Sequence, residues 1–105
     1  MTIPKIQLLV FEGCPLADAA KRTLDEVVAS LNLGAYEVID ILAPETSETL
    51  KKWGSPTILV NGHDVAGGVP GDSVGCRVYA GPDRVPDSDT IIGCIRREWA
   101  RRDRP

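Results

Sequence analysis

The side chains best suited to reaction or metal binding are those of three cysteines, Cys14, Cys76 and Cys94, and one histidine, His63. An odd number of cysteines cannot form a closed set of disulfides, which favours free thiols in a reducing compartment. No two of them form a C-x-x-C pair, so a structural zinc ribbon is excluded. An ionised thiol is a nucleophile toward disulfides and a ligand for soft metal ions, and these are the two chemistries to consider.

Cys14 has the most informative position, between Gly13 and Pro15. The apolar segment before it is typical of a buried strand, and the period after it becomes helical. Pro15 suits the first position of a helix, where its missing amide hydrogen costs nothing. Unpaired amides and the positive end of the helix would then stabilise a thiolate at Cys14. The alternative is a buried, inert cysteine at a strand end.

The other candidate groups are less specific. Cys94 lies beside the apolar stripe of the last predicted helix, which is typical of a buried thiol acting as a small hydrophobic side chain. His63 follows a predicted tight turn, where most histidines are solvated. Asp18 and Lys21 fall in the first turns after Cys14, where each would tune its charge or simply face water.

The elements that position these groups follow from periodicity and turn residues. Apolar residues from Leu16 to Leu31 recur at three- and four-residue steps, and Gly34 is expected to cap that helix. Asn61-Gly62 predicts a type I′ hairpin turn. The sequence therefore predicts strands at 5–11, 36–42, 57–60 and 63–66, and helices at 15–31, at 44–53 and from Ser88 or Asp89 onward.

This order, βαβαββα, predicts an α/β domain covering residues 1–105. The first two strands should be parallel with a right-handed crossover. The hairpin adds an antiparallel pair, which gives a four-stranded mixed sheet with helices on both faces. Residues 69–86 form a long Gly- and Pro-rich loop, and loops of that length in small domains are often functional.

Three motifs in this order resemble the thioredoxin-like superfamily, and small glutaredoxin-like domains in particular. The segment 11–17, Phe-Glu-Gly-Cys-Pro-Leu-Ala, resembles the active-site turn of that family. The segment 54–62, Gly-Ser-Pro-Thr-Ile-Leu-Val-Asn-Gly, resembles the family's cis-proline before the third strand. Residues 65–68, Val-Ala-Gly-Gly, resemble its closing Gly-Gly. The resemblance covers residues 5–68.

The resemblance implies a thioredoxin-like fold with Cys14 as nucleophile and a cis bond before Pro56. It implies substrate contacts from a set of residues on the three motifs: Pro15, Ser55, Pro56, Thr57, Gly67 and Gly68. The family's second active-site cysteine is replaced by Ala17, so a single-cysteine cycle is expected. Cys76, in the long loop, is a candidate replacement for the resolving thiol, or a loop thiol with no partner.

The leading interpretation is therefore a thiol-disulfide oxidoreductase acting on glutathione or a protein disulfide, with glutathione as co-substrate and no other cofactor. One alternative is a soft-metal protein, binding mercury, copper or zinc through the thiolates of Cys14 and Cys76. The other is a thioredoxin-like binding module without turnover, for which Ala17 would be the signature of a degenerate site.

Composition restricts the partners. The chain is 43% hydrophobic and 26% charged with a formal net charge of −3, which argues against nucleic acid as the main partner. The C-terminal arginines are interpreted as a solvated helix end. Neither a membrane span nor a signal peptide is apparent, so a cytoplasmic location without membrane association is expected.

Overall fold

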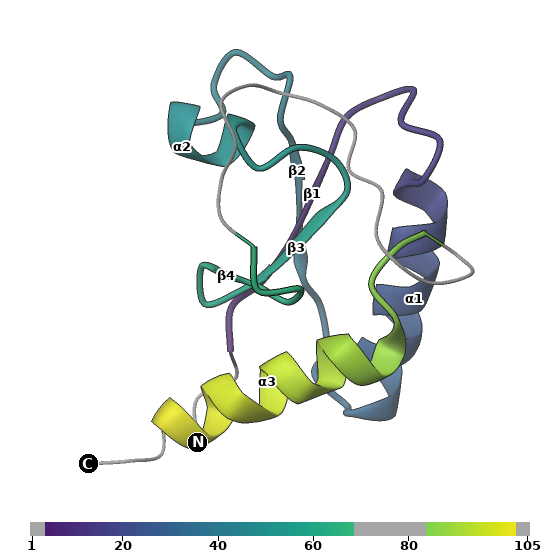
Figure 1. Cartoon of the computed structure of the whole chain (residues 1–105), viewed down its shortest axis with the longest axis vertical. Helices are drawn as coiled ribbons and strands as arrows, with labels where there is room; N and C mark the ends of the chain where they lie inside the picture. The colour runs from purple at the N-terminus through teal and green to yellow at the C-terminus, as the bar shows by residue number, and fades with distance from the viewer. Residues whose placement is uncertain (1–3, 69–83, 103–105) are drawn as a thin grey trace.

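A four-stranded mixed sheet forms the centre of the computed structural model, which describes residues 4–68 and 84–102 (Figure 1). The sheet order is β2-β1-β3-β4. β1 is parallel to β2 and antiparallel to β3, and β4 is antiparallel to β3. The predicted α/β class and mixed sheet are confirmed. The strands are β1 (Ile6–Val10), β2 (Glu37–Asp40), β3 (Thr57–Val60) and β4 (His63–Asp64).

Alternate side chains of the central strands serve two separate cores, because successive residues of a strand point to opposite faces. Leu8 and Ile58 pack on one face with α1 (Ala17–Ser30) and α3 (Ser88–Arg102). Leu9 and Leu59 pack on the other face with Leu50 of α2 (Glu48–Lys51). The predicted helical cover on both faces is therefore observed.

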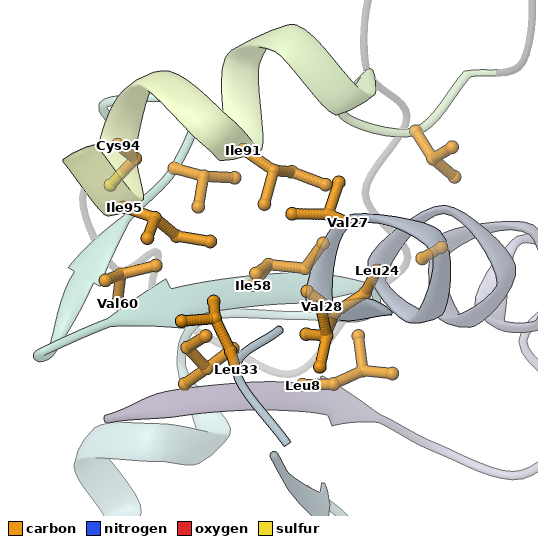
Figure 2. Packing of buried hydrophobic residues seen from close by; sticks show 14 residues of the cluster. Leu8, Leu24, Val27, Val28, Leu33, Ile58, Val60, Ile91, Cys94 and Ile95 are labelled. Carbon is orange, nitrogen blue, oxygen red and sulfur yellow. The ribbon is translucent and has the colours of Figure 1, made fainter. Parts of the chain in front are cut away.

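The larger core lies between β1, β3 and the two long helices (Figure 2). Val27 of α1 points toward Ile91 of α3, and Leu24 and Ile95 are buried in the same core between the helices and the sheet. These are the residues whose helical spacing predicted an apolar stripe. Their burial removes apolar surface from water at roughly 25 cal/mol per Å², which is the main force holding the helices on the sheet.

Helix α1 ends in a Schellman motif built on Asn32. The amide of Asn32 donates to the carbonyl of Ala29 at 3.2 Å, and the amide of Leu33 donates to that of Val28 at 3.0 Å. Asn32 has φ +55°, the left-handed conformation that this motif needs. The prediction that Gly34 caps the helix was wrong by two residues, because asparagine also tolerates this conformation.

Three elements are shorter than predicted, each because a polar side chain captures nearby backbone groups. After β2, the carboxylate of Asp40 accepts from the amide of Leu42 at 2.8 Å. The short helix begins only at Glu48, since Ser47 caps it by accepting from the amide of Leu50. The fourth strand ends at Asp64, whose carboxylate accepts from the amide of Gly68 at 2.9 Å.

Two local predictions match the structure closely. Asn61 and Gly62 have φ +53° and +84°, as a type I′ turn requires. α3 begins at Ser88 after Asp87, whose carboxylate accepts from the amide of Thr90 at 2.8 Å. In residues 4–68 and 84–102, no helix has both the length and the apolar character needed to cross a membrane.

Candidate functional site

Cys14 follows the end of β1 at the junction of two consecutive tight turns. In the first, the amide of Cys14 donates to the carbonyl of Phe11 at 3.2 Å. Gly13, the third residue of that turn, has φ +90°, which a type II turn requires and glycine supplies without strain. In the second turn, the amide of Ala17 donates to the carbonyl of Cys14 at 3.2 Å.

The second turn corrects the predicted start of the helix. Pro15 is the second residue of the turn from Cys14 to Ala17, and Leu16 has φ −103° and ψ −1°, close to a type I turn. The helix begins at Ala17, three residues after Cys14. Proline fits both positions, since each needs φ near −65°. The first helical turn therefore starts farther from the thiol than the sequence predicted.

The Cys14 side chain points to the segment before β3. Its Sγ lies 3.6 Å from the carbonyl oxygen of Ser55, as donor to it, and the residue is 9% exposed. A carbonyl accepts a hydrogen bond only from the protonated thiol. This contact therefore suits the thiol as the donor.

The segment around Pro56 is held in one conformation. The Ser55–Pro56 peptide bond is cis, as the family resemblance implied. The Ser55 hydroxyl accepts from the amide of Phe11 at 3.3 Å. The Thr57 hydroxyl lies 3.0 Å from the carbonyl of Gly54, as donor. Ser55, Pro56 and Thr57 are all buried, and the segment contacts Cys14 through the Ser55 carbonyl.

The two glycines expected to contact substrate belong to a loop organised by Asp64. The amide of Gly67 donates to the carbonyl of Asp64 at 2.9 Å, and the amide of Gly68 donates to its carboxylate. Both glycines are exposed. Their role toward substrate stays a prediction, as does that of Pro15.

Cys76 lies outside the described residues, so its approach to Cys14 stays a prediction. Cys94 is buried in the core of α1 and α3, as predicted, and is 3% exposed (Figure 2). Burial raises the pKa of the Cys94 thiol, with Glu98 adding to the effect and Arg97 opposing it. Cys94 is therefore a packing residue.

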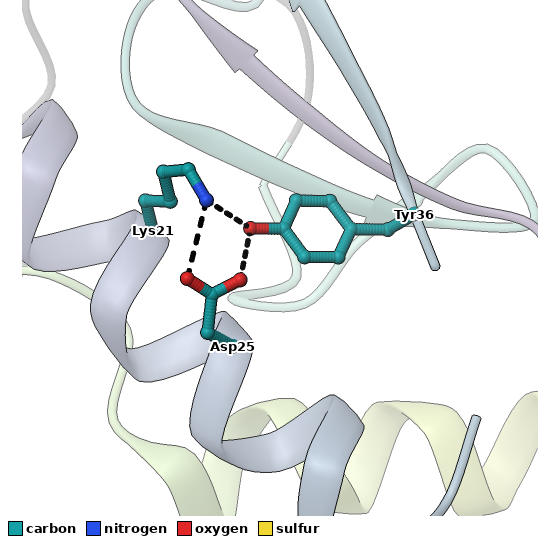
Figure 3. Close-up of polar contacts among 3 residues, drawn as sticks. All are labelled: Lys21, Asp25 and Tyr36. Atoms are coloured by element: carbon teal, nitrogen blue, oxygen red, sulfur yellow. Dashed lines mark hydrogen bonds and ion pairs between the residues drawn. The ribbon is translucent and has the colours of Figure 1, made fainter. Parts of the chain in front are cut away.

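Lys21, proposed as a group that tunes Cys14, is engaged elsewhere. Its Nζ donates to Asp25 Oδ2 at 3.2 Å and to Tyr36 Oη at 3.3 Å (Figure 3). The Tyr36 hydroxyl in turn donates to Asp25 Oδ1. The hydrogen bonds from Tyr36 and then Lys21 lower the pKa of Asp25, and those to Tyr36 and Asp25 raise the pKa of Lys21. This cluster ties α1 to the segment before β2.

The sequence did not predict the contacts made by Ser55, Asp64 and His63. The role of Ser55 toward substrate stays a prediction, as do those of Pro56 and Thr57, and the sequence did not predict that its carbonyl and hydroxyl accept from Cys14 and Phe11. Asp64 was overlooked, although Asp before a Gly-rich stretch is a frequent turn signal. His63 is exposed as expected, but its Nε2 lies 3.9 Å from the buried carboxylate of Glu98. No sequence signal pointed to that contact.

The part of the chain that the structure describes contains no group of three or more His, Cys, Asp or Glu side chains that could hold a metal ion. The proposed soft-metal pair of Cys14 and Cys76 includes a residue outside that part and stays a prediction. The chain was also compared with known proteins. No family model, no curated protein and no solved structure matches it.

Proposed function

We propose that this chain has a thioredoxin-like fold and acts as a glutaredoxin- or thioredoxin-like thiol-disulfide oxidoreductase, with Cys14 as nucleophile. The observation that carries the proposal is the 3.6 Å contact between Cys14 Sγ and the carbonyl of Ser55, the residue that precedes the cis-proline. A cysteine after the first strand thereby meets the residues before the third. The sheet order β2-β1-β3-β4 supports the same proposal.

The reaction is a thiol-disulfide exchange. Cys14 loses its proton to solvent, and its thiolate attacks one sulfur of a disulfide. A mixed disulfide forms at Cys14, while the second sulfur leaves with the bonding electron pair as a thiolate. A glutathione thiolate then attacks the substrate sulfur of the mixed disulfide, which forms a new disulfide and releases the Cys14 thiolate. Alternatively, the Cys76 thiolate attacks Cys14 Sγ, which forms a Cys14–Cys76 bridge and releases the substrate thiolate.

A binding module without turnover is the second candidate, favoured by two observations. Ala17 stands where a resolving cysteine is expected. The Cys14 thiol is nearly buried and donates to a carbonyl, a contact that suits its protonated form. Such a module would keep the turn around Cys14 but would not catalyse thiol-disulfide exchange.

The experiment exposes the reduced protein to oxidised glutathione and maps each cysteine by non-reducing peptide mass spectrometry. A Cys14–glutathione adduct that excess glutathione reverses supports the single-cysteine cycle. A Cys14–Cys76 bridge instead identifies Cys76 as the resolving thiol and keeps soft-metal binding as a candidate. Cys14 that stays unmodified, while the denatured protein reacts, supports the binding module.

Two variants test whether Cys14 is the nucleophile and Cys76 the resolving thiol. Cys14→Ser keeps a donor to the Ser55 carbonyl and removes the nucleophile, so it should lose the adduct and retain its thermal unfolding temperature within a few degrees. Cys76→Ser should still form the Cys14 adduct and should lose any bridge. An adduct that persists at another cysteine in Cys14→Ser would contradict the assignment of the nucleophile.

A further inference from the structure

β2 is an edge strand whose backbone presents hydrogen-bonding groups on its open side. In the order β2-β1-β3-β4 it has β1 on one side and no neighbouring strand among the described residues on the other. The amide of Ile41 donates to the carbonyl of Val10 at 2.9 Å, so the odd-numbered residues here direct their backbone groups to β1. Because successive residues alternate, the amides and carbonyls of Val38 and Asp40 face the open side, where a further strand can pair.

The loop after β2 closes one end of this edge and leaves its middle open. The carbonyl of Asp40 accepts from the Thr46 hydroxyl at 2.6 Å and from the amide of Ala43 at 3.2 Å. Val38, in the middle of the strand, is 52% exposed. Its partner in the register is Leu8, so the Val38 side chain lies on the face of the sheet that carries α1. The open part of the edge is therefore centred on an apolar residue.

Antiparallel pairing of this edge with a second copy places a two-fold axis at one of the four residues of β2. An axis at Glu37 would set two Glu37 carboxylates opposite each other, and an axis at Asp40 would do the same with Asp40, so repulsion disfavours both. An axis at Ile39 would need the Asp40 carbonyl as an acceptor, and the loop already engages it. An axis at Val38 avoids these conflicts, because Glu37 then lies opposite Ile39.

The axis at Val38 also brings unlike charges together. Asp40 of one copy then lies opposite Tyr36 of the other, on the face that carries α1. The Lys21 ammonium lies 5.7 Å from the centre of the Tyr36 ring and donates to the Tyr36 hydroxyl (Figure 3). Opposite residues of paired strands have Cβ atoms about 4.5–5.5 Å apart, so the Asp40 carboxylate approaches this ammonium. Lys21 is already paired with Asp25, so the added attraction is modest.

We propose that β2 is the interface of a weak dimer, in which two copies of this chain pair antiparallel about a two-fold axis at Val38 and form one continuous sheet. Val38 of each copy donates to and accepts from Val38 of the other, with Cα atoms about 5.5 Å apart. The amide of Asp40 donates to the carbonyl of Tyr36. Because a short strand buries little surface, half-association is expected at roughly 0.1–1 mM. This inference does not depend on the chemistry of Cys14.

Sedimentation equilibrium of the full chain tests the association. A phosphine reductant is kept in excess, so that disulfide-linked dimers do not form. The weight-average mass should be close to that of one chain at about 10 µM and about 1.5-fold higher or more at about 1 mM.

Amide chemical shifts followed by NMR over the same concentrations test the register. Shifts of the amide protons should be largest at Val38 and Asp40, because these amides gain acceptors in the dimer. They should be smaller at Ile41, whose amide already donates to Val10. A set of shifts centred on another element would overturn the assignment of the interface to β2.

Three variants of Val38 separate the interface from the fold. Val38→Pro removes the central donor, and proline is tolerated at an edge strand when its nitrogen faces the open side. Val38→Asp keeps the donor and sets two carboxylates opposite each other. Both should stay at the monomer mass at about 1 mM. Val38→Thr keeps the donor and the branched shape, and its dissociation constant should stay within about threefold of the parent value.

Glu26→Gln, which removes an exposed charge on α1, is the matched control and should associate as the parent chain does. Thermal unfolding shows which variants are folded, and if Val38→Pro does not fold, Val38→Asp decides. A parent chain at the monomer mass at about 1 mM overturns the proposal and leaves the edge to a strand of another protein. Association that persists unchanged in a folded Val38→Asp or Val38→Pro overturns it as well, because the interface would then lie elsewhere.

Discussion

At the scale of single residues, Cys14 and Cys94 are both buried, but their neighbours differ. Cys94 is packed among the side chains between α1 and α3. Cys14 is shared by two consecutive turns, and its thiol donates to the carbonyl of Ser55. The same functional group packs between helices in one place and contacts a backbone carbonyl at a turn in the other. The difference comes from the neighbouring elements, since residue type is identical.

Cys94 makes the stability of the protein depend on pH in the alkaline range. Burial raises its pKa in the folded state above the ordinary value of about 8.5. The folded state then holds the proton that the unfolded state has lost, so this contribution is complete below about pH 8.5 and declines as pH rises toward the folded pKa. The free energy of unfolding should therefore fall as pH rises above about 8.5.

Urea unfolding at several pH values measures this dependence, with Cys94→Ala as the comparison. The variant is expected to be less stable at neutral pH, because it leaves a small cavity, and to show a shallower decline above pH 8.5. Equal slopes in the two proteins would contradict the assignment to Cys94 and point to other groups such as Tyr36, whose pKa burial also raises.

At the scale of elements, the ends of helices and strands are set by single polar residues. Asp40, Ser47 and Asp64 each accept backbone hydrogen bonds, and each ends or begins an element there. These side chains compete with secondary structure for backbone groups. Hydrophobic periodicity does not register this competition, and it therefore overestimated the lengths of the elements.

Asn32 gives a test at the end of α1. Asn32→Ala should lower the free energy of unfolding by about 1 kcal/mol, because alanine at φ +55° places its Cβ too close to the backbone. Asn32→Gly should change it by less than about 0.5 kcal/mol, since glycine has no Cβ. Chemical denaturation of both variants measures the difference.

An exposed position on the same helix provides the control for the Asn32 variants. Glu26→Ala should change stability by no more than about 0.5 kcal/mol. If Asn32→Ala and Asn32→Gly were equally stable, the left-handed conformation at residue 32 would not contribute to the helix end.

At the scale of the whole molecule, the helices cover the centre of the sheet and leave its β2 edge open. Val38 on β2 is 52% exposed and Leu42, which follows this strand, is 56% exposed. Leu8, the partner of Val38 in the sheet register, is buried beneath the helices. Apolar residues one strand apart therefore contribute very differently to stability.

Substitutions on α1 and β2 measure that difference. Leu24→Ala should cost about 2–5 kcal/mol, because Leu24 is fully buried and the core cannot close the cavity completely. Val38→Ala should cost no more than about 0.5 kcal/mol, since solvent already reaches the side chain. Equal losses in thermal unfolding would mean that β2 is covered in solution.

The sequence by itself determined the α/β class, the order of the elements and the apolar stripes of the two long helices. Apolar periodicity and turn residues are local signals, and the core positions of α1 and α3 follow directly from them. Asn61-Gly62 likewise predicted the type I′ turn between β3 and β4, because a turn signal is also local. Cys14 was chosen as the candidate nucleophile from its place between a predicted strand and a predicted helix, next to Pro15, and from the family resemblance.

Only the tertiary structure decided what Cys14 touches. Its contact with Ser55 joins residues 41 positions apart, and a pairing at that distance depends on how β1 and β3 register in the sheet. The engagement of Lys21 by Tyr36 depends in the same way on how the segment before β2 lies against α1. Local pattern determines which residues face inward. The packing of elements on one another determines which polar groups meet, because each such contact is selected by the whole fold.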